Sequence, residues 1–135
     1  MLAGCGSTER PVAYEDLTAQ LRPAEFPRQI RQIFRSRSEL VDYLEHAMPG
    51  RRLQVPRIDF ARREAILLAA GPRSSTGYEL RILSVRETGS RIIVRMRERA
   101  PSLGDTGTAK VTYPFRLISV PRSGKSLRLK WLGRP

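Results

Sequence analysis

The sequence has one cysteine and one histidine among its 135 residues. A single cysteine excludes an intrachain disulfide, so the fold cannot depend on one. Cys5 and His46 together are too few for the three or four soft ligands of a usual zinc site. His46 also lies on a predicted helix face with no nucleophile motif near it. We therefore predict a non-enzymatic chain with no catalytic residue, no metal site and no cofactor.

Long apolar runs and aromatic residues are also scarce. No apolar stretch approaches the roughly 18 residues that a membrane-spanning helix requires. Aromatic residues make up only 7% of the chain, which leaves little material for stacking on bases and makes nucleic acid an unfavoured partner. Hydrophobic residues, at 40%, are still frequent enough for a packed core, and the length suits one domain with a short tail.

Acidic residues and lysine are under-represented, and arginine takes their place. The chain has 25 basic and 13 acidic residues, and only three of the basic residues are lysine, which leaves 25 − 3 = 22 arginines. After residue 56 the balance is 17 basic to 6 acidic, a net charge of +11. Such a field attracts acidic proteins, anionic lipid headgroups or nucleic acid, and its sign does not choose among them. Arginine-rich coding by a GC-rich genome is an equally consistent explanation.

The amino terminus contains a short motif typical of bacterial lipoproteins, Leu2-Ala3-Gly4-Cys5. In that motif small residues precede a cysteine that becomes lipid-modified. Only four residues precede Cys5, so a basic start and an apolar run of about 7 to 15 residues would have to lie upstream; an incidental thiol is the alternative. The residues that follow are polar and have no clear period, and we predict a flexible tether over residues 1–25.

A helix is predicted over about residues 37–48. Ser36 and Glu39 have the spacing of a capping box, in which the serine hydroxyl accepts from the Glu39 amide and the carboxylate accepts from the serine amide. Leu40, Leu44 and Met48 then recur at helical spacing and should face the core. Upstream of the helix, residues 29–34 are predicted to form a short strand.

From residue 59 to 135 the pattern changes to short runs separated by turn residues, which is typical of antiparallel β structure. Strands are predicted over residues 64–70, 78–87, 91–99, 108–113, 115–120 and 127–132. The second and third should pair through a hairpin at residues 88–90. Alternation in the third predicts a basic strand face, made by Arg91, Arg95, Arg97 and Arg99. The expected fold class is mainly β (α+β), with about six to seven strands and one N-terminal helix packed on them.

Two loops are candidate contact surfaces. The first is a Gly-Tyr loop made by Arg73, Ser74, Ser75, Thr76, Gly77 and Tyr78. It is not a phosphate-binding loop, because no Lys-Ser/Thr and no helix follow its glycine. It either presents hydrogen-bonding groups and an aromatic ring to a partner or is a turn whose Tyr78 anchors the core. The second loop begins with Pro101, Ser102, Leu103 and Gly104.

Four short motifs occur in a recognisable order: Ile58-Asp59-Phe60, Gly71-x-Arg73, the Gly-Tyr loop and Thr112-x-Pro114. From about residue 34 to 120 the chain resembles the carboxyl-terminal domain of PrcB-type protease-complex subunits. The loop of that family commonly reads Thr-Gly-Gly-Tyr, whereas this chain has Ser75-Thr76-Gly77-Tyr78. The difference brings the loop closer to the Thr-Thr-Gly-Tyr/Phe loop of chagasin-like cysteine-protease inhibitors, to which the family is similar in layout.

The resemblance implies an immunoglobulin-like β-sandwich in a single domain over residues 26–135. It also implies an envelope-anchored or secreted protein-binding domain that associates with or stabilises a protease complex, attached to the bacterial envelope through Cys5. No small-molecule substrate is expected. Two other functions stay open: a basic module that binds nucleic acid or lipid headgroups, and a chagasin-like inhibitor. Those inhibitors carry an Arg-Pro-Trp loop that this chain lacks, so association is favoured over inhibition.

Overall fold

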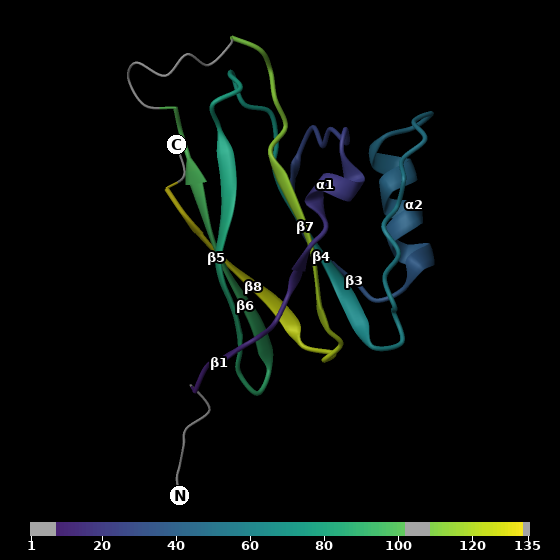
Figure 1. Ribbon diagram of the computed structural model, residues 1–135, viewed down its shortest axis with the longest axis vertical. Coiled ribbons are helices and arrows are strands. Elements are labelled where there is room, and N and C mark those ends of the chain that lie inside the picture. Colours follow the sequence, from purple (N-terminus) through teal and green to yellow (C-terminus); the bar gives the residue numbers. More distant parts are fainter. Residues whose placement is uncertain (1–7, 102–108, 134–135) are drawn as a thin grey trace, which may run out of the picture.

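The computed structural model describes residues 8–101 and 109–133, which Figure 1 colours from purple to yellow. In this part of the chain, eight strands form two four-stranded sheets, with two helices beside them. The elements are β1 (Arg10–Pro11), β2 (Glu15–Asp16), α1 (Thr18–Leu21), β3 (Gln29–Phe34), α2 (Arg37–Ala47), β4 (Arg63–Ala70), β5 (Glu79–Glu87), β6 (Arg91–Arg99), β7 (Phe115–Pro121) and β8 (Ser126–Leu132). The fold is therefore mainly β, as predicted.

The strands are arranged as sheet A, in the order β1-β5-β6-β8, and sheet B, in the order β2-β7-β4-β3. Neighbouring strands are antiparallel except β6 and β8, which are parallel, so the prediction of a purely antiparallel unit is wrong at this pair. The reason is the path of the chain: after β6 it crosses to sheet B for β7 before returning as β8, and parallel neighbours require such a crossover. The immunoglobulin-like type of sandwich stays a prediction.

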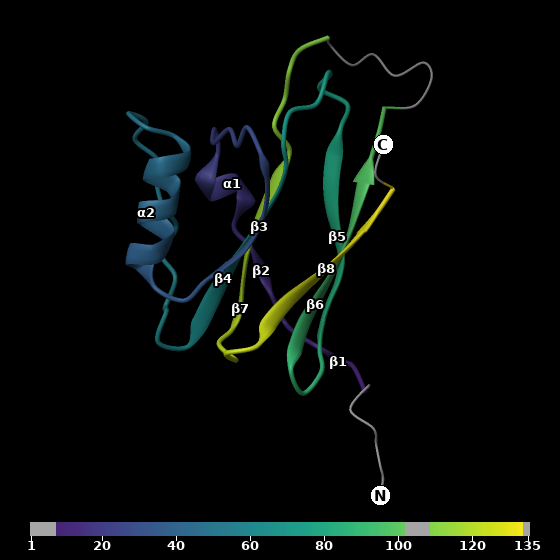
Figure 2. The same cartoon turned by 180° about the vertical axis from the view of Figure 1, so that it is seen from behind.

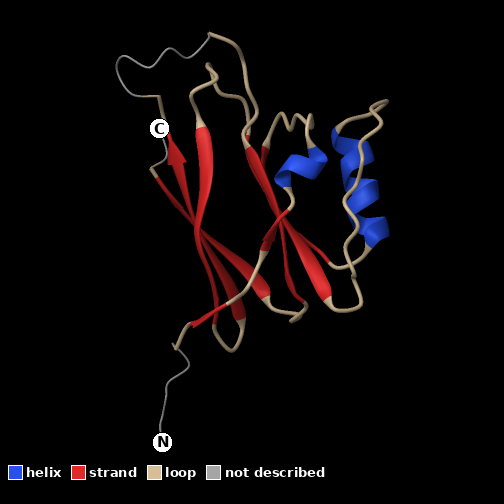
Figure 3. Cartoon of the chain, viewed as in Figure 1, coloured by secondary structure: helices blue, strands red, loops and turns tan. Residues whose placement is uncertain are grey.

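The molecule has three layers, and the view from behind in Figure 2 and the colours of Figure 3 show sheet A, sheet B and the helices in that order. β4 lies in the middle layer and is covered on both faces, which explains its continuous apolar run. Alternate residues of β4 thus enter two cores. Ile66 and Leu68 enter the inter-sheet core, with Leu80, Val94, Met96 and Ile118. Ala65 and Leu67 enter the helix-side core, with Leu21, Phe26, Leu40, Leu44 and Leu117.

The predicted helix is confirmed as α2, which ends at Ala47, and its apolar face rests on sheet B. The Glu39 amide donates to the Ser36 hydroxyl at 3.1 Å, as the capping motif predicts. The other half of the motif differs: the Glu39 carboxylate accepts from the amide of Arg35, at 3.3 Å, and not from that of Ser36. Neither helix of the described residues is long and apolar enough to cross a membrane.

The prediction of a flexible tether over residues 1–25 is wrong for its second half. β1 pairs with β5, and β2 pairs with β7. Leu17 and Leu21 are buried, and the Leu117 amide donates to the Thr18 hydroxyl at 3.0 Å. The segment lacks a period because its short elements supply edge strands to both sheets and then a helical turn to the helix-side core. Leu2 and Cys5 lie outside the described residues.

Candidate functional site

The Gly-Tyr loop lies at one end of the two sheets, where it joins β4 to β5, and residues 109–114 lie beside it (Figure 1). Arg73 and Thr112 exchange two backbone hydrogen bonds, of 2.8 and 2.9 Å. The Thr112 hydroxyl also donates to the Ser75 carbonyl, at 2.7 Å. This isolated bridge replaces the strand predicted over residues 108–113, as far as those residues are described. The two segments therefore form one surface, which we call the loop end.

Arg73 fastens the loop to sheet A. Its guanidinium makes two hydrogen bonds to the carboxylate of Glu98 on β6, one through Nε to Oε2 and one through Nη2 to Oε1 at 3.0 Å. The Glu98 side chain is fully buried, and that of Arg73 is 16% exposed. The hydrogen bonds that Arg73 donates to Glu98 raise the pKa of Arg73 above its ordinary value. The guanidinium therefore stays charged at every pH at which the protein is folded. Arg73 therefore holds the loop against β6.

Gly77 is needed for a close approach and not for an unusual backbone conformation. A Cβ atom placed on Gly77 would lie 2.7 Å from Cγ and 2.8 Å from Cβ of Pro101, and its φ is not in the left-handed region. Because a proline ring cannot swing aside, any larger side chain at this position would push the two loops apart. The structure thus joins the first predicted loop to the first residue of the second; Ser102, Leu103 and Gly104 lie outside the described residues.

This contact predicts different effects for two alanine substitutions in the turns at either end of β5. Gly77→Ala should lower the free energy of unfolding by about 1–3 kcal/mol, because the new methyl group overlaps the Pro101 ring. Gly89→Ala is the matched control, since nothing lies within 4 Å of its Cβ position. It should change stability by less than about 0.5 kcal/mol. Urea denaturation of both variants measures the difference, and equal stability would contradict the role given to Pro101.

The loop presents its remaining residues outward to different extents. Ser74 and Thr76 are exposed, while Ser75 and Tyr78 are partly buried. Tyr78 belongs to neither hydrophobic core, so it does not anchor the core as the simpler interpretation of the loop supposed. Thr76, at the position where the family commonly has glycine, places its side chain on the surface. The outer rim of the loop is therefore polar, with one partly covered aromatic ring at its base.

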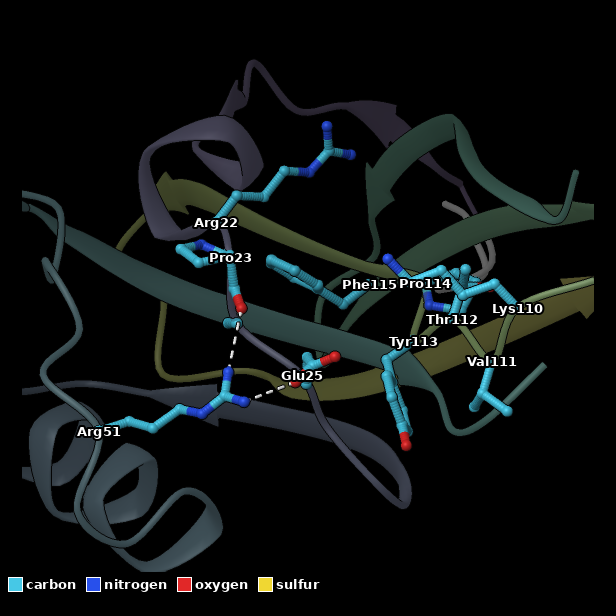
Figure 4. A pocket seen from close by; sticks show the side chains of 11 residues that line it. Arg22, Pro23, Glu25, Arg51, Lys110, Val111, Thr112, Tyr113, Pro114 and Phe115 are labelled. Carbon is cyan, nitrogen blue, oxygen red and sulfur yellow. Dashed lines mark hydrogen bonds and ion pairs between the residues drawn. The ribbon is translucent and has the colours of Figure 1, made fainter. Parts of the chain in front are cut away.

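A pocket of about 390 Å³ lies beside the bridge between Arg73 and Thr112, and Figure 4 shows the residues that line it. It lies between residues 22–25, which follow α1, and residues 110–115, and Thr112 belongs to both the pocket and the loop bridge. Arg51 closes one side, with hydrogen bonds from Nη2 to the Glu25 carboxylate at 2.7 Å and from Nη1 to the Pro23 carbonyl at 3.5 Å. The pocket went unpredicted because residues 22–25 were assigned to a tether.

Comparison with known proteins gives a match for the segment that contains the Gly-Tyr loop. Residues 65–121 match the family model described as PrcB C-terminal. This part of the chain is similar to the PrcB C-terminal family. The match confirms the resemblance inferred from the short motifs, over a narrower range than the predicted residues 34–120. No curated protein and no solved structure matches the chain.

The PrcB C-terminal segment contains the parts that shape the loop end. It runs from β4 to the end of β7 and so includes the loop, its buried anchor Glu98, the packing residue Pro101 and the bridging residue Thr112. The other wall of the pocket, residues 22–25 and Arg51, lies outside the match. The loop end therefore lies within the matched segment, and one wall of the pocket beside it comes from residues outside the match.

The predicted basic strand face forms a second surface, on the outer side of sheet A, and its Arg99 lies opposite Glu79, next to the loop end. Arg91, Arg95, Arg97 and Arg99 are exposed on the side of β6 that points away from sheet B. Ile93 interrupts the row and is buried, although it belongs to neither core. The four arginines therefore share one exposed side of β6, and their role as a binding face stays a prediction.

The one histidine of the chain lies away from both surfaces, on α2. His46 is exposed on α2, and its Nδ1 lies 2.8 Å from the Asp42 carbonyl oxygen. Within the described ranges, no three His, Cys, Asp or Glu side chains are close enough to hold a metal ion. What the loop end offers is a set of hydroxyl groups, backbone amides and an aromatic ring beside a pocket. Such an arrangement suits recognition of another protein.

Proposed function

We propose that this chain is a non-enzymatic protein-binding domain that associates with a protease complex and contacts its partner through the loop end. The match of residues 65–121 to the PrcB C-terminal family supports association with this kind of complex. The lipobox-like Leu2 to Cys5 supports a place at the bacterial cell envelope as part of the same proposal. Association is proposed in preference to inhibition, since the Arg-Pro-Trp loop of chagasin-like inhibitors is absent.

The observation that carries the proposal is that the loop is held from three sides while its rim stays exposed. Glu98 binds the Arg73 side chain, Thr112 binds the backbone at Arg73 and Ser75, and Pro101 packs against Gly77. A loop ordered before binding loses less conformational entropy when a partner arrives, which increases affinity. A turn that only connected two strands would not need a buried ion pair beneath it.

The adjacent pocket gives the partner a place for an apolar group. Its lining combines Pro23, Tyr113 and Phe115 with the ion pair of Arg51 and Glu25. Aromatic and proline surfaces beside arginine are typical of the central parts of protein interfaces. Thr112 lines the pocket and also bonds to the loop, so the pocket and the loop rim are adjacent. A partner segment that lies across the rim would therefore extend over Thr112 into the pocket.

Photocrosslinking in the native host tests the proposal. A crosslinking amino acid at Ser74, which is exposed on the rim, should give an adduct whose second component is identified as a protease subunit by mass spectrometry. The same amino acid at Gly89, in the hairpin at the other end of β5, should give none (Figures 1 and 2). Adding Tyr78→Ala to the Ser74 chain should lower the adduct yield several-fold, as loss of an aromatic contact does.

Three results would contradict the proposal. One is an adduct at Gly89 as strong as that at Ser74, since the loop end would then have no special role. Another is an adduct at Ser74 that contains no protease subunit. The third is a yield that Tyr78→Ala leaves unchanged in a variant whose circular dichroism and thermal midpoint match those of the parent.

A further inference from the structure

The outer face of sheet A carries a dense array of cations across three neighbouring strands. Register places Arg81 of β5 opposite Arg97 of β6, and Arg95 of β6 beside Lys130 of β8. The same alternation turns further basic residues outward. The complete set is Arg81, Arg86, Arg91, Arg95, Arg97, Arg99, Arg128 and Lys130, all of them exposed. We call this surface the basic face.

Carboxylates are almost absent from the basic face. Glu79 is the one acidic side chain that the register turns outward on β5, β6 and β8, and it pairs with Arg81 at 3.1 Å. The net charge of the face is therefore 8 − 1 = +7. The other acidic residues of these strands are paired differently: the buried Glu98 pairs with Arg73, and Glu87, at the end of β5, pairs with Arg10 and Lys125.

This arrangement costs the free protein stability. Adjacent strands lie only about 4.8 Å apart, and like charges placed directly opposite each other are destabilising. An ordinary solvated sheet face mixes both signs and avoids the repulsion. Glu79 offsets part of this repulsion at Arg81. An external anionic surface that faces the strands together would relieve the repulsion between Arg95 and Lys130 and the rest of that between Arg97 and Arg81.

We propose that the basic face binds the surface of an anionic phospholipid bilayer, independently of the partner at the loop end. Each basic side chain near such a surface adds to the attraction, and the face presents eight of them on one side of a sheet. An apolar side chain accompanies them: Leu83, at a bulge in β5, is 44% exposed. Ile93, flanked by Arg86 and Arg128, is covered as arginine stems cover apolar surface.

Two other occupants fit the basic face less well. Single-stranded nucleic acid requires aromatic rings on which bases stack, and the outward residues of β5, β6 and β8 include none. A protein partner requires a central apolar cluster with a polar rim, whereas here the centre is arginine and Leu83 is its one strongly exposed large hydrophobic residue. An anionic bilayer is a wide, charged and chemically repetitive surface, and its binding requires neither stacking aromatic rings nor a central apolar cluster.

Vesicle co-sedimentation tests this proposal. The chain should bind vesicles of phosphatidylcholine with about a third phosphatidylglycerol, and should not bind vesicles of pure phosphatidylcholine. Raising the salt from about 0.1 M to 1 M shortens the Debye length from about 10 to about 3 Å and should release the protein. Neutralising three adjacent charges, with Arg95→Gln, Arg97→Gln and Lys130→Gln, should lower the partition coefficient roughly 100-fold. The same variant should fold normally, because it removes like-charge repulsion.

A matched variant shows whether vesicle binding depends on the basic face itself or only on the net charge of the protein. Arg28→Gln, Arg52→Gln and Arg57→Gln remove the same number of charges from exposed positions that line the helix layer. They should lower the partition coefficient less than about fivefold. Equal losses in the two triple variants, equal binding to both kinds of vesicle, or tighter binding to single-stranded or duplex DNA than to anionic vesicles would each overturn the proposal. Crosslinking at Ser74 reports on the loop end separately, so one proposal can fail without the other.

Discussion

Replacing Arg73 with alanine should lower the free energy of unfolding by about 3–5 kcal/mol at neutral pH. The variant leaves the carboxylate of Glu98 fully buried without the guanidinium that now makes two hydrogen bonds to it. Removing one partner of a buried ion pair costs far more than the pair itself contributes, because the remaining charge has lost its solvent and gained nothing. The loss should be seen as a lower midpoint in urea with little change in the denaturant slope.

A control for this prediction is available on β5, the strand that pairs with β6 beside Glu98. Arg81 pairs with Glu79 at 3.1 Å, but both side chains are largely exposed, at 56% and 44%. Arg81→Ala should therefore change stability by no more than about 1 kcal/mol. A loss in Arg73→Ala as small as that in Arg81→Ala would show that the buried pair does not hold the loop.

A double variant distinguishes the cost of leaving the Glu98 charge buried and unpaired from the cost of losing the contact between the two side chains. In Arg73→Met with Glu98→Leu, both charges are gone and apolar groups fill similar volumes. Replacing a whole buried pair in this way is often neutral or stabilising, so the double variant should be more stable than Arg73→Ala. If it is less stable, the pair's hydrogen-bond geometry, and not the buried charge, sets the stability of the loop end.

The six longer strands, β3 to β8, were predictable from the sequence because they have strong local signals. Alternation in β6 placed its arginines on one face, and the turn at residues 88–90 fixed the pairing of β5 with β6. The apolar run of β4 indicated a buried strand. The parallel pairing of β6 with β8 was not predictable in this way, because nothing local to either strand records the crossover through sheet B.

The loop end was only half predictable, for a related physical reason. The residues of the loop stand together in the sequence, and their Gly-Tyr motif identifies them. Their supports come from distant positions: Glu98 is 25 residues away from Arg73, and Thr112 is 37 residues away from Ser75. In the sequence, Glu98 stands among the alternating arginines of β6 and cannot be distinguished from a solvent-exposed charge. Only the pairing of the sheets shows which carboxylate is buried.

The amino-terminal segment gives the second large prediction. Leu21→Ala should lower the free energy of unfolding by about 2–5 kcal/mol, because Leu21 is 1% exposed and its removal leaves a cavity in the helix-side core. The side chain lies in one cluster with Phe26, whose ring meets that of Phe115 edge to face with centroids 5.2 Å apart. A cavity there would loosen the contact between α1 and β7 on which the pocket wall depends.

Gln20→Ala is the matched control, since Gln20 precedes Leu21 in the same helix and is exposed. It should change stability by less than about 0.5 kcal/mol. The comparison decides between two descriptions of the segment. A tether would make both substitutions neutral, whereas a segment that completes the core makes only the buried one costly. A loss below about 1 kcal/mol in Leu21→Ala would contradict the packing described here, and with it the claim that residues 22–25 hold a fixed wall beside the loop.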